Sequence, residues 1–162
     1  MRRSIIPLAT LVWSLAALAI MHDTTIATNA TPSPLALSDQ SDALRLAEQI
    51  LIQADQFESS SVGFAAVTPA SVLAWHVILD SPHPDGAFRD VFARAGTAGQ
   101  LYALAALRRI DPQAYAQYSD DLRRRGGSID VVRGCIGSRD PIAKILAEID
   151  DDEWTRDFDG AY

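Results

Sequence analysis

Apolar and polar residues recur along most of the chain with the spacing of amphipathic helices. Between residues 43 and 54, apolar positions follow a helical period, while charged and amide side chains occupy the opposite face. Residues 72–79 are instead apolar around most of their girth, so we expect this helix to be the buried one. Residues 142–149 place isoleucine and leucine at i, i+3, i+4 and i+7, which predicts another helix.

Pairs of a polar residue and a proline mark where three of the helices begin. The polar side chain can accept a hydrogen bond from a free backbone amide, and proline at the first helical position has no amide to leave unsatisfied. One pair precedes residues 72–79, and Pro82 and Pro84 then end that helix. The three pairs are Thr68 with Pro69, Asp111 with Pro112, and Asp140 with Pro141.

Two further short helices are predicted between the first two pairs. Residues 88–95 form one, closed by Gly96, and residues 97–107 form the other, opened by a capping box of Thr97 and Gln100. Residues 128–137 are ambiguous, because their β-branched side chains suit a strand that has no obvious partner. The chain therefore predicts an all-α fold, an irregular array of about five or six short helices packed as helical hairpins after an N-terminal hydrophobic leader helix.

The repeated order of polar residue, proline and apolar helix resembles the helix pairs of HEAT-like repeat proteins. The match is nearest at residues 75–110, where the alanine-rich run 101–107 suits close helix packing. The three prolines are spaced by 43 and 29 residues, which departs from a fixed repeat. The resemblance implies a scaffold that presents a surface to a partner, and it transfers no functional residues.

The first 30 residues have the pattern of an export signal. Arg2 and Arg3 precede 17 uncharged residues, 5–21, a length between that of a signal-peptide core and that of a spanning helix. Small residues precede two possible cleavage points, after Ala27 and after Ala30. Two interpretations stay open for residues 1–30, a cleaved signal peptide and an uncleaved N-terminal membrane anchor. Residues 31–40 are expected to be a linker, 41–153 a helical domain, and 154–162 an acidic C-terminal tail.

Composition narrows the classes of partner. The chain has a formal net charge of −7, and cleavage after Ala30 would leave 12 basic and 20 acidic residues, a net charge of −8. Nucleic-acid binding is disfavoured, because it depends largely on Lys and Arg contacts to phosphate. One Lys against 13 Arg favours a GC-rich coding sequence and hence a bacterial source. The single cysteine excludes an internal disulfide.

Two sets of residues are candidates for catalysis. Cys135 lies among glycines whose backbone amides could hold an oxyanion beside a thiol nucleophile, although a free cysteine is more often a small buried apolar residue. His76 and Asp80 are four residues apart in one predicted helix, so they could pair as a base and its orienting carboxylate, or form a structural hydrogen bond. His83 lies between prolines in a predicted exposed turn.

The acidic tail contains the candidates for a metal site. Asp157 and Asp159 with Gly160 resemble a fragment of a calcium loop, although the chain ends before the bidentate acid that such a loop requires. Blocks of like charge are more often solvated chain ends. The spacing of cysteine and histidine predicts no zinc site, and we expect no cofactor.

These observations lead to an expected function. We expect an exported domain, periplasmic or extracellular or held by its leader, that binds another protein or a cell-envelope component without catalysis. Membrane contact is expected only through the leader. The alternative is a small envelope enzyme that uses Cys135 or the pair of His76 and Asp80.

Overall fold

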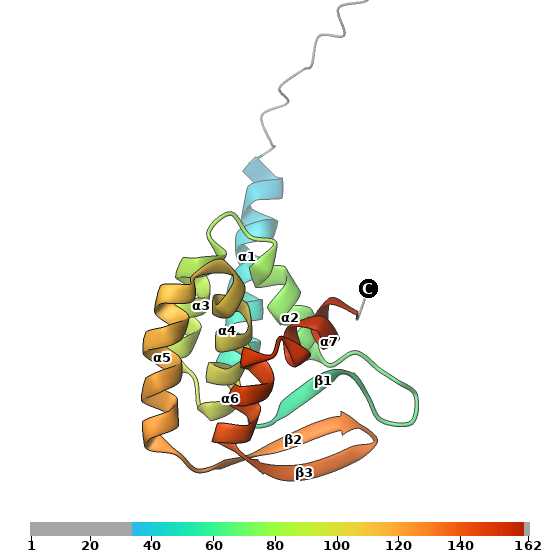
Figure 1. The fold of residues 1–162 in the computed structure, drawn as a ribbon. Helices are drawn as coiled ribbons and strands as arrows, with labels where there is room; N and C mark the ends of the chain where they lie inside the picture. The colour runs from blue at the N-terminus through green and yellow to red at the C-terminus, as the bar shows by residue number, and fades with distance from the viewer. Residues whose placement is uncertain (1–33, 161–162) are drawn as a thin grey trace, which may run out of the picture. The chain divides into compact units, whose positions relative to one another are not determined.

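The computed structural model describes residues 34–160, which form seven helices and three strands (Figure 1). In chain order the elements are α1 (Pro34–Ile52), β1 (Phe57–Val62), α2 (Ala70–Leu79), α3 (Pro84–Arg94), α4 (Thr97–Ile110), α5 (Pro112–Arg125), β2 (Ser128–Gly134), β3 (Ile136–Pro141), α6 (Ile142–Asp150) and α7 (Glu153–Asp159). The expected leader, residues 1–30, lies outside the described residues.

The mostly helical character predicted from the sequence is confirmed, but the all-α class is wrong because the fold contains a sheet. The ambiguous residues 128–137 form most of the β2–β3 hairpin, and the partner strand is β1. The strand order is β1-β2-β3, with β1 parallel to β2 and β2 antiparallel to β3. In the register, Phe57 faces Val131 and Asp130 faces Arg139.

The helices surround α4 instead of forming a linear stack. α4 contacts α1, α2, α3, α5, α6 and α7 as well as β1, and its residues 98–107 are all buried. Small side chains in the alanine-rich run allow these neighbours to approach closely. In a HEAT-like array each unit contacts only the adjacent ones. The arrangement around α4 therefore differs from that array.

An aromatic cluster joins the sheet to the helices. Phe57 of β1 lies 4.6 Å from Tyr102 and 4.2 Å from Trp154 between ring centroids, and Trp75 lies 5.3 Å from Phe158. All five side chains are at most 1% exposed. Offset and edge-on ring pairs at such distances add to the free energy that burial provides. This cluster fixes α2, α4 and α7 against β1.

A polar network crosses the same core beside the aromatic rings. The Tyr102 hydroxyl accepts a hydrogen bond from the Glu58 amide at 2.8 Å and donates to Ser71 Oγ at 2.9 Å. Ser71 in turn donates to Glu58 Oε2 at 2.9 Å. Burial raises the pKa of Tyr102, so the hydroxyl keeps its proton and remains a donor. The network satisfies polar groups that the contact of β1, α2 and α4 removes from water.

The chain ends differ from the sequence-based boundaries. α1 begins at Pro34, inside the predicted linker 31–40, where proline suits a first helical turn and Leu and Ala continue it. At the other end, residues expected in a solvated acidic tail form α7. Trp154 and Phe158 lie one turn apart on α7 and are buried, so this segment belongs to the core.

Of two predicted side-chain caps at helix starts, the hydrogen bonds confirm one and not the other. Asp111 caps α5 as expected, because its carboxylate accepts the Ala114 amide at 3.1 Å. The capping box of Thr97 and Gln100 is absent from α4, whose first turn has no side-chain cap. Gln100 is instead buried, and its amide donates to the Phe92 carbonyl at 3.1 Å.

Candidate functional site

Helix α2 leaves an apolar face uncovered, although its sequence predicted burial on nearly all sides. Val72, Trp75 and Ile78 are buried as expected. Leu73 and Val77, four residues apart, are 45% and 42% exposed. A helix that is apolar all round is normally enclosed, so this uncovered face is the feature that most needs an explanation.

α1 provides a second wall beside this face and so creates a groove. The two helices run antiparallel, since residues near the end of α1 lie beside the start of α2. Leu46 of α1 is 63% exposed and faces the same groove. The groove has a volume of about 240 Å³ and only apolar side chains line it: Ala43, Leu46, Ala47, Ile50, Ala70, Leu73, Ala74 and Val77. We call this feature the α1–α2 groove.

The groove continues into a more polar recess at the other end of α2. This recess has a volume of about 500 Å³ and shares Ala43 and Val77 with the groove. Asp80 and the exposed His83 lie along it, together with Gln40 of α1. The two hollows together follow α1 from Gln40 to Ile50, which at the helical rise corresponds to about 15 Å.

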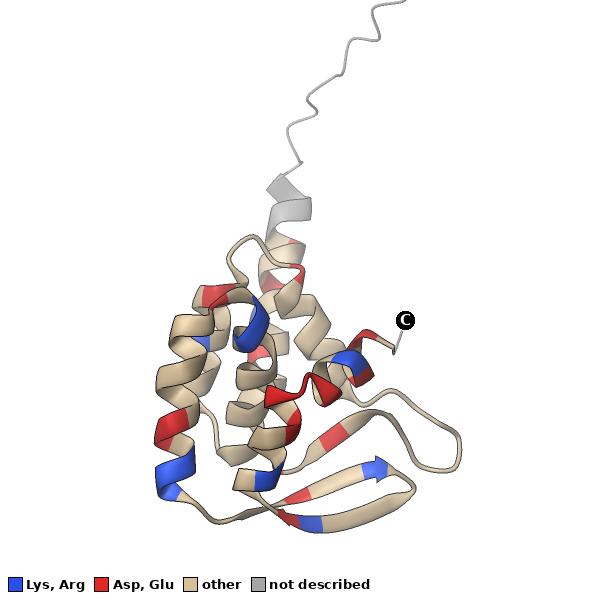
Figure 2. Cartoon of the chain, in the orientation of Figure 1, with Lys and Arg blue, Asp and Glu red and all other residues tan. Residues whose placement is uncertain are grey.

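The charges around the groove are mainly acidic. α2 has no Lys, Arg, Asp or Glu (Figure 2). On α1, Asp39 lies one turn before Ala43 on the same face, and Asp42 lies on the flank. The nearby cation, Arg45, is 2.7 Å from the Asp42 carboxylate. Together with Asp80 at the recess, the acidic residues around the groove and recess outnumber the single basic residue, Arg45.

His76 and Asp80 line a further hollow of α2, which shares Val77 with the groove and Asp80 with the polar recess. A shallow recess of about 510 Å³ is lined by both of them and by Arg109 and Asp159. His76 Nε2 is 3.0 Å from the Phe158 carbonyl oxygen. Because a carbonyl oxygen only accepts, Nε2 carries the hydrogen of this bond, which holds α7 against α2.

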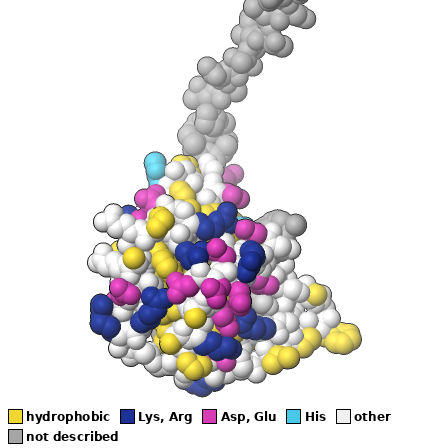
Figure 3. All heavy atoms as spheres, viewed as in Figure 1, with side chains coloured by type: hydrophobic (Ala, Val, Ile, Leu, Met, Phe, Trp, Pro, Cys, Tyr) yellow, Lys and Arg dark blue, Asp and Glu magenta, His cyan; other side chains and the backbone are white. Residues whose placement is uncertain are grey.

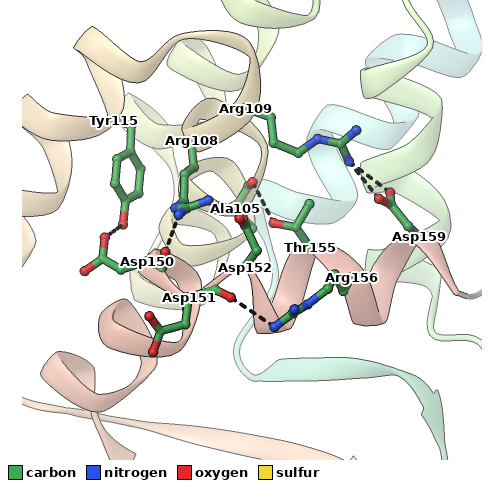
Figure 4. A network of polar contacts seen from close by, with 10 residues as sticks. All are labelled: Ala105, Arg108, Arg109, Tyr115, Asp150, Asp151, Asp152, Thr155, Arg156 and Asp159. Carbon is green, nitrogen blue, oxygen red and sulfur yellow. Dashed lines mark hydrogen bonds and ion pairs between the residues drawn. The ribbon is translucent and has the colours of Figure 1, made fainter.

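Figure 4 shows the ion-pair network that occupies the neighbouring surface between α4 and α7. Arg108 pairs with Asp152, and Arg109 contacts the Asp159 carboxylate at 2.8 Å. Tyr115 donates a hydrogen bond to Asp150, and burial together with this contact raises its pKa. These residues belong to α4, α5, α6, the α6–α7 junction and α7, so the network joins these parts of the fold. Figure 3 shows that charges of both signs cover this face.

The two candidate metal ligands point to different partners. Asp157 accepts the Ser60 amide at 2.7 Å and the Ser60 hydroxyl at 3.2 Å, so it covers an outer edge of β1. Asp159 is paired with Arg109. The structure therefore does not bring the two carboxylates together. Within residues 34–160, no three His, Cys, Asp or Glu side chains gather closely enough to hold a metal ion.

Cys135 is exposed at the turn between β2 and β3, contrary to the buried position that a structural cysteine would have. The turn follows Arg133, which faces Ile136 in the strand register. Cys135 does not line the recess of His76 and Asp80, so the two sets of catalytic candidates lie at different places. Within residues 34–160, Cys135 therefore shares no site with His76.

The α1–α2 groove could not be recognised as a site from the sequence. Its signal was the uninterrupted apolar character of residues 72–79, which burial explained equally well. Among the helices of residues 34–160, none combines the length and apolar character needed to cross a membrane. No protein-family model, no curated protein and no solved structure matches this chain.

Proposed function

We propose that this chain is a non-catalytic protein-binding module, exported from the cytoplasm, whose α1–α2 groove receives an amphipathic helix of a partner protein. The observation that carries the proposal is the exposure of Leu46, Leu73 and Val77 along one continuous apolar groove. Grooves between two helices commonly bind the apolar face of a third helix, through anchors at i, i+3, i+4 and i+7.

The dimensions of the groove support a short helical ligand. A length of about 15 Å corresponds to roughly three helical turns. Covering side chains that are about half exposed contributes on the order of 1 kcal/mol each, since full burial of such a residue contributes about 1.5–3 kcal/mol. Ordering a helix opposes this gain. We therefore expect moderate affinity, with the anchors concentrated at Leu73 and Val77.

The charge around the groove supports a basic partner. Asp39 and Asp42 of α1 and Asp80 at the recess carry three negative charges against the one positive charge of Arg45, which pairs with Asp42. The described domain as a whole is acidic. Opposite charge at the rim raises the association rate and disfavours acidic competitors. The expected ligand is a helix with one apolar face and Lys or Arg on its flanks.

A designed peptide with these features tests the proposal directly. The probe is a fluorescent peptide of about 14 residues with Leu at helical spacing on one face and Lys on the flanks of that face. We expect its anisotropy to rise with protein concentration and Leu73→Asp to weaken binding by at least about ten-fold. Ile136→Asp, an exposed apolar position outside the groove, is the matched control. Equal binding by Leu73→Asp, or by a scrambled peptide, contradicts the proposal.

Export is tested separately, by fractionation of cells that produce the full chain. The expected result is protein outside the cytoplasm, with a mass that corresponds to cleavage after Ala27 or Ala30, or intact protein in the membrane fraction. Soluble intact chain in the cytoplasm contradicts export but leaves the groove proposal standing.

A further inference from the structure

Two loops lie side by side at one end of the sheet and form an uncharged apolar surface. The β1–α2 loop is closed by paired hydrogen bonds between Val62 and Val67, each of 2.9 Å. The Gly63 amide donates to the Gly134 carbonyl at 2.9 Å, which attaches this loop to the β2–β3 turn. We call the exposed residues of both loops the apolar tip: Phe64, Ala65, Ala66, Val67, Cys135 and Ile136.

The apolar tip is the most exposed group of large apolar side chains in the described residues. Phe64 is 103% exposed, Ile136 71% and Val67 59%. The chain carries no Lys, Arg, Asp or Glu between Glu58 and Asp80, and both loops lack charge in Figure 2. Figure 3 shows apolar side chains at this end of the molecule, at the edge of the face that carries the charged side chains. Isolated apolar residues need no explanation, but a contiguous patch of this kind does.

The form of the tip indicates what covers it. The apolar side chains stand on loops at the end of the sheet (Figure 1), so they can enter a fluid apolar layer without a shaped pocket to receive them. Part of the loop backbone is satisfied internally, because Val62, Gly63, Ala66 and Val67 all donate hydrogen bonds within the two loops. These four amides can leave water with their hydrogen bonds kept.

The neighbouring charges favour a phospholipid surface. The charged residues closest to the turn along the chain are Arg133, which pairs with Glu148 and lies over the Trp154 ring, and Arg139, which pairs with Asp130. The pair of Arg139 and Asp130 is exposed and therefore weak, so a headgroup phosphate can compete for Arg139. Arginines next to an exposed apolar tip can contact headgroup phosphates while the apolar side chains enter the acyl boundary. Self-association through the tip is the alternative, which light scattering separates from lipid binding.

We propose that the apolar tip inserts into the interfacial layer of a phospholipid bilayer, with Phe64 and Ile136 as the principal anchors. This membrane contact is independent of the groove and differs from the expectation that only the leader touches a membrane. The tip is small, so the binding is reversible and strengthens any other attachment to the same surface.

Cys135 provides a reporter for the test, because it is the single cysteine of the chain and is exposed within the tip. The experiment uses residues 32–162, which form a compact unit that contains the whole buried core and omits the apolar leader. Cys135 is labelled with an environment-sensitive fluorophore and titrated with phosphatidylcholine vesicles. Co-sedimentation of unlabelled protein with the same vesicles gives a second readout.

We expect the fluorescence to rise and shift to the blue, and Phe64→Ser and Ile136→Ser each to lower the partition coefficient about ten-fold. Leu73→Ser, at an exposed apolar residue of the groove, is the matched control and should change it less than about two-fold. The proposal is overturned if vesicles do not raise the fluorescence of the label, or if Leu73→Ser lowers the partition coefficient as much as the two tip variants do. The proposal is also overturned if the fluorescence rises with protein concentration in the absence of vesicles while light scattering gives twice the monomer mass. That result would assign the tip to self-association.

Discussion

Adding one methyl group at Gly99 tests the close packing of α1 against α4. Gly99 lies in the first turn of α4, against the end of α1. A Cβ atom at this position would lie 2.2 Å from the Leu51 carbonyl oxygen and 2.6 Å from the Ala95 Cβ. Ordinary contact begins near 3.4 Å, so α1 and α4 must separate by about 1.2 Å at this point. The obstacle is backbone, which cannot rotate away.

The expected effect of Gly99→Ala has two opposing parts. Alanine in a helix is favoured over glycine by about 1 kcal/mol. Overpacking of a core costs about 1–3 kcal/mol, and a rigid backbone neighbour places this site at the upper end. The net expectation is a loss of about 2 kcal/mol in the free energy of unfolding. At a slope of about 1.5 kcal/mol per M, the urea midpoint falls by more than about 1 M.

Urea unfolding of residues 32–162, followed through the buried Trp75 and Trp154, measures this effect. Gly86→Ala in α3 is the matched control, because its Cβ would meet nothing within 4 Å. This variant should gain up to about 1 kcal/mol. If Gly99→Ala is as stable as the wild type, the close approach of α1 to α4 is refuted.

Three further variants test other parts of the account. Tyr102→Phe removes a hydroxyl that the Glu58 amide and Ser71 both use, so we expect a loss of about 1–3 kcal/mol in urea unfolding, and an unchanged midpoint contradicts the buried network. Asp157→Ala removes the acceptor of the Ser60 amide, so hydrogen exchange at that amide should accelerate, and unchanged exchange argues against the cap on β1. Hydrogen bonds from the Ala114 amide and Arg89 lower the pKa of Asp111 below its ordinary value of 3.8. The ionised carboxylate therefore stabilises the fold above pH 3.8, and this stabilisation is lost as the pH falls through the lowered pKa. Asp111→Asn should therefore unfold with a shallower acid dependence below about pH 5, and an identical profile contradicts the assignment.

Most helix positions followed from local signals, but those of α7 and of the first part of α1 did not, and neither did the sheet. The pair of Asp111 and Pro112 correctly marked the start of α5, since both capping and the missing amide act within one turn. β1 and β2 pair across about 70 residues of chain, and β1 contains three consecutive serines that give no apolar alternation. Nonlocal pairing of this kind depends on how the intervening helices fold back, which no local pattern reports.

The exposure of the α1–α2 groove also depends on nonlocal packing that the sequence pattern does not report. Residues 72–79 were correctly recognised as a strongly apolar helix, but their exposure depends on how many neighbours the rest of the chain can supply. α1 is the main neighbour of α2, whereas α3, α4 and β1 contact it less, and together they leave Leu73 and Val77 exposed. In α7, surrounding carboxylates obscured the one-turn spacing of Trp154 and Phe158, which was the available signal for a buried helix.

The most direct test of the central proposal is to locate the bound peptide by NMR. The ¹⁵N-labelled protein, residues 32–162, is titrated with the basic amphipathic peptide, and backbone amide shifts are followed residue by residue. The proposal predicts that the largest changes lie in α1 and α2, around Leu46, Leu73 and Val77, and that Leu73→Asp abolishes them. Changes centred on the ion-pair surface of α4 and α7 or on the apolar tip, with α1 and α2 unaffected, would contradict it.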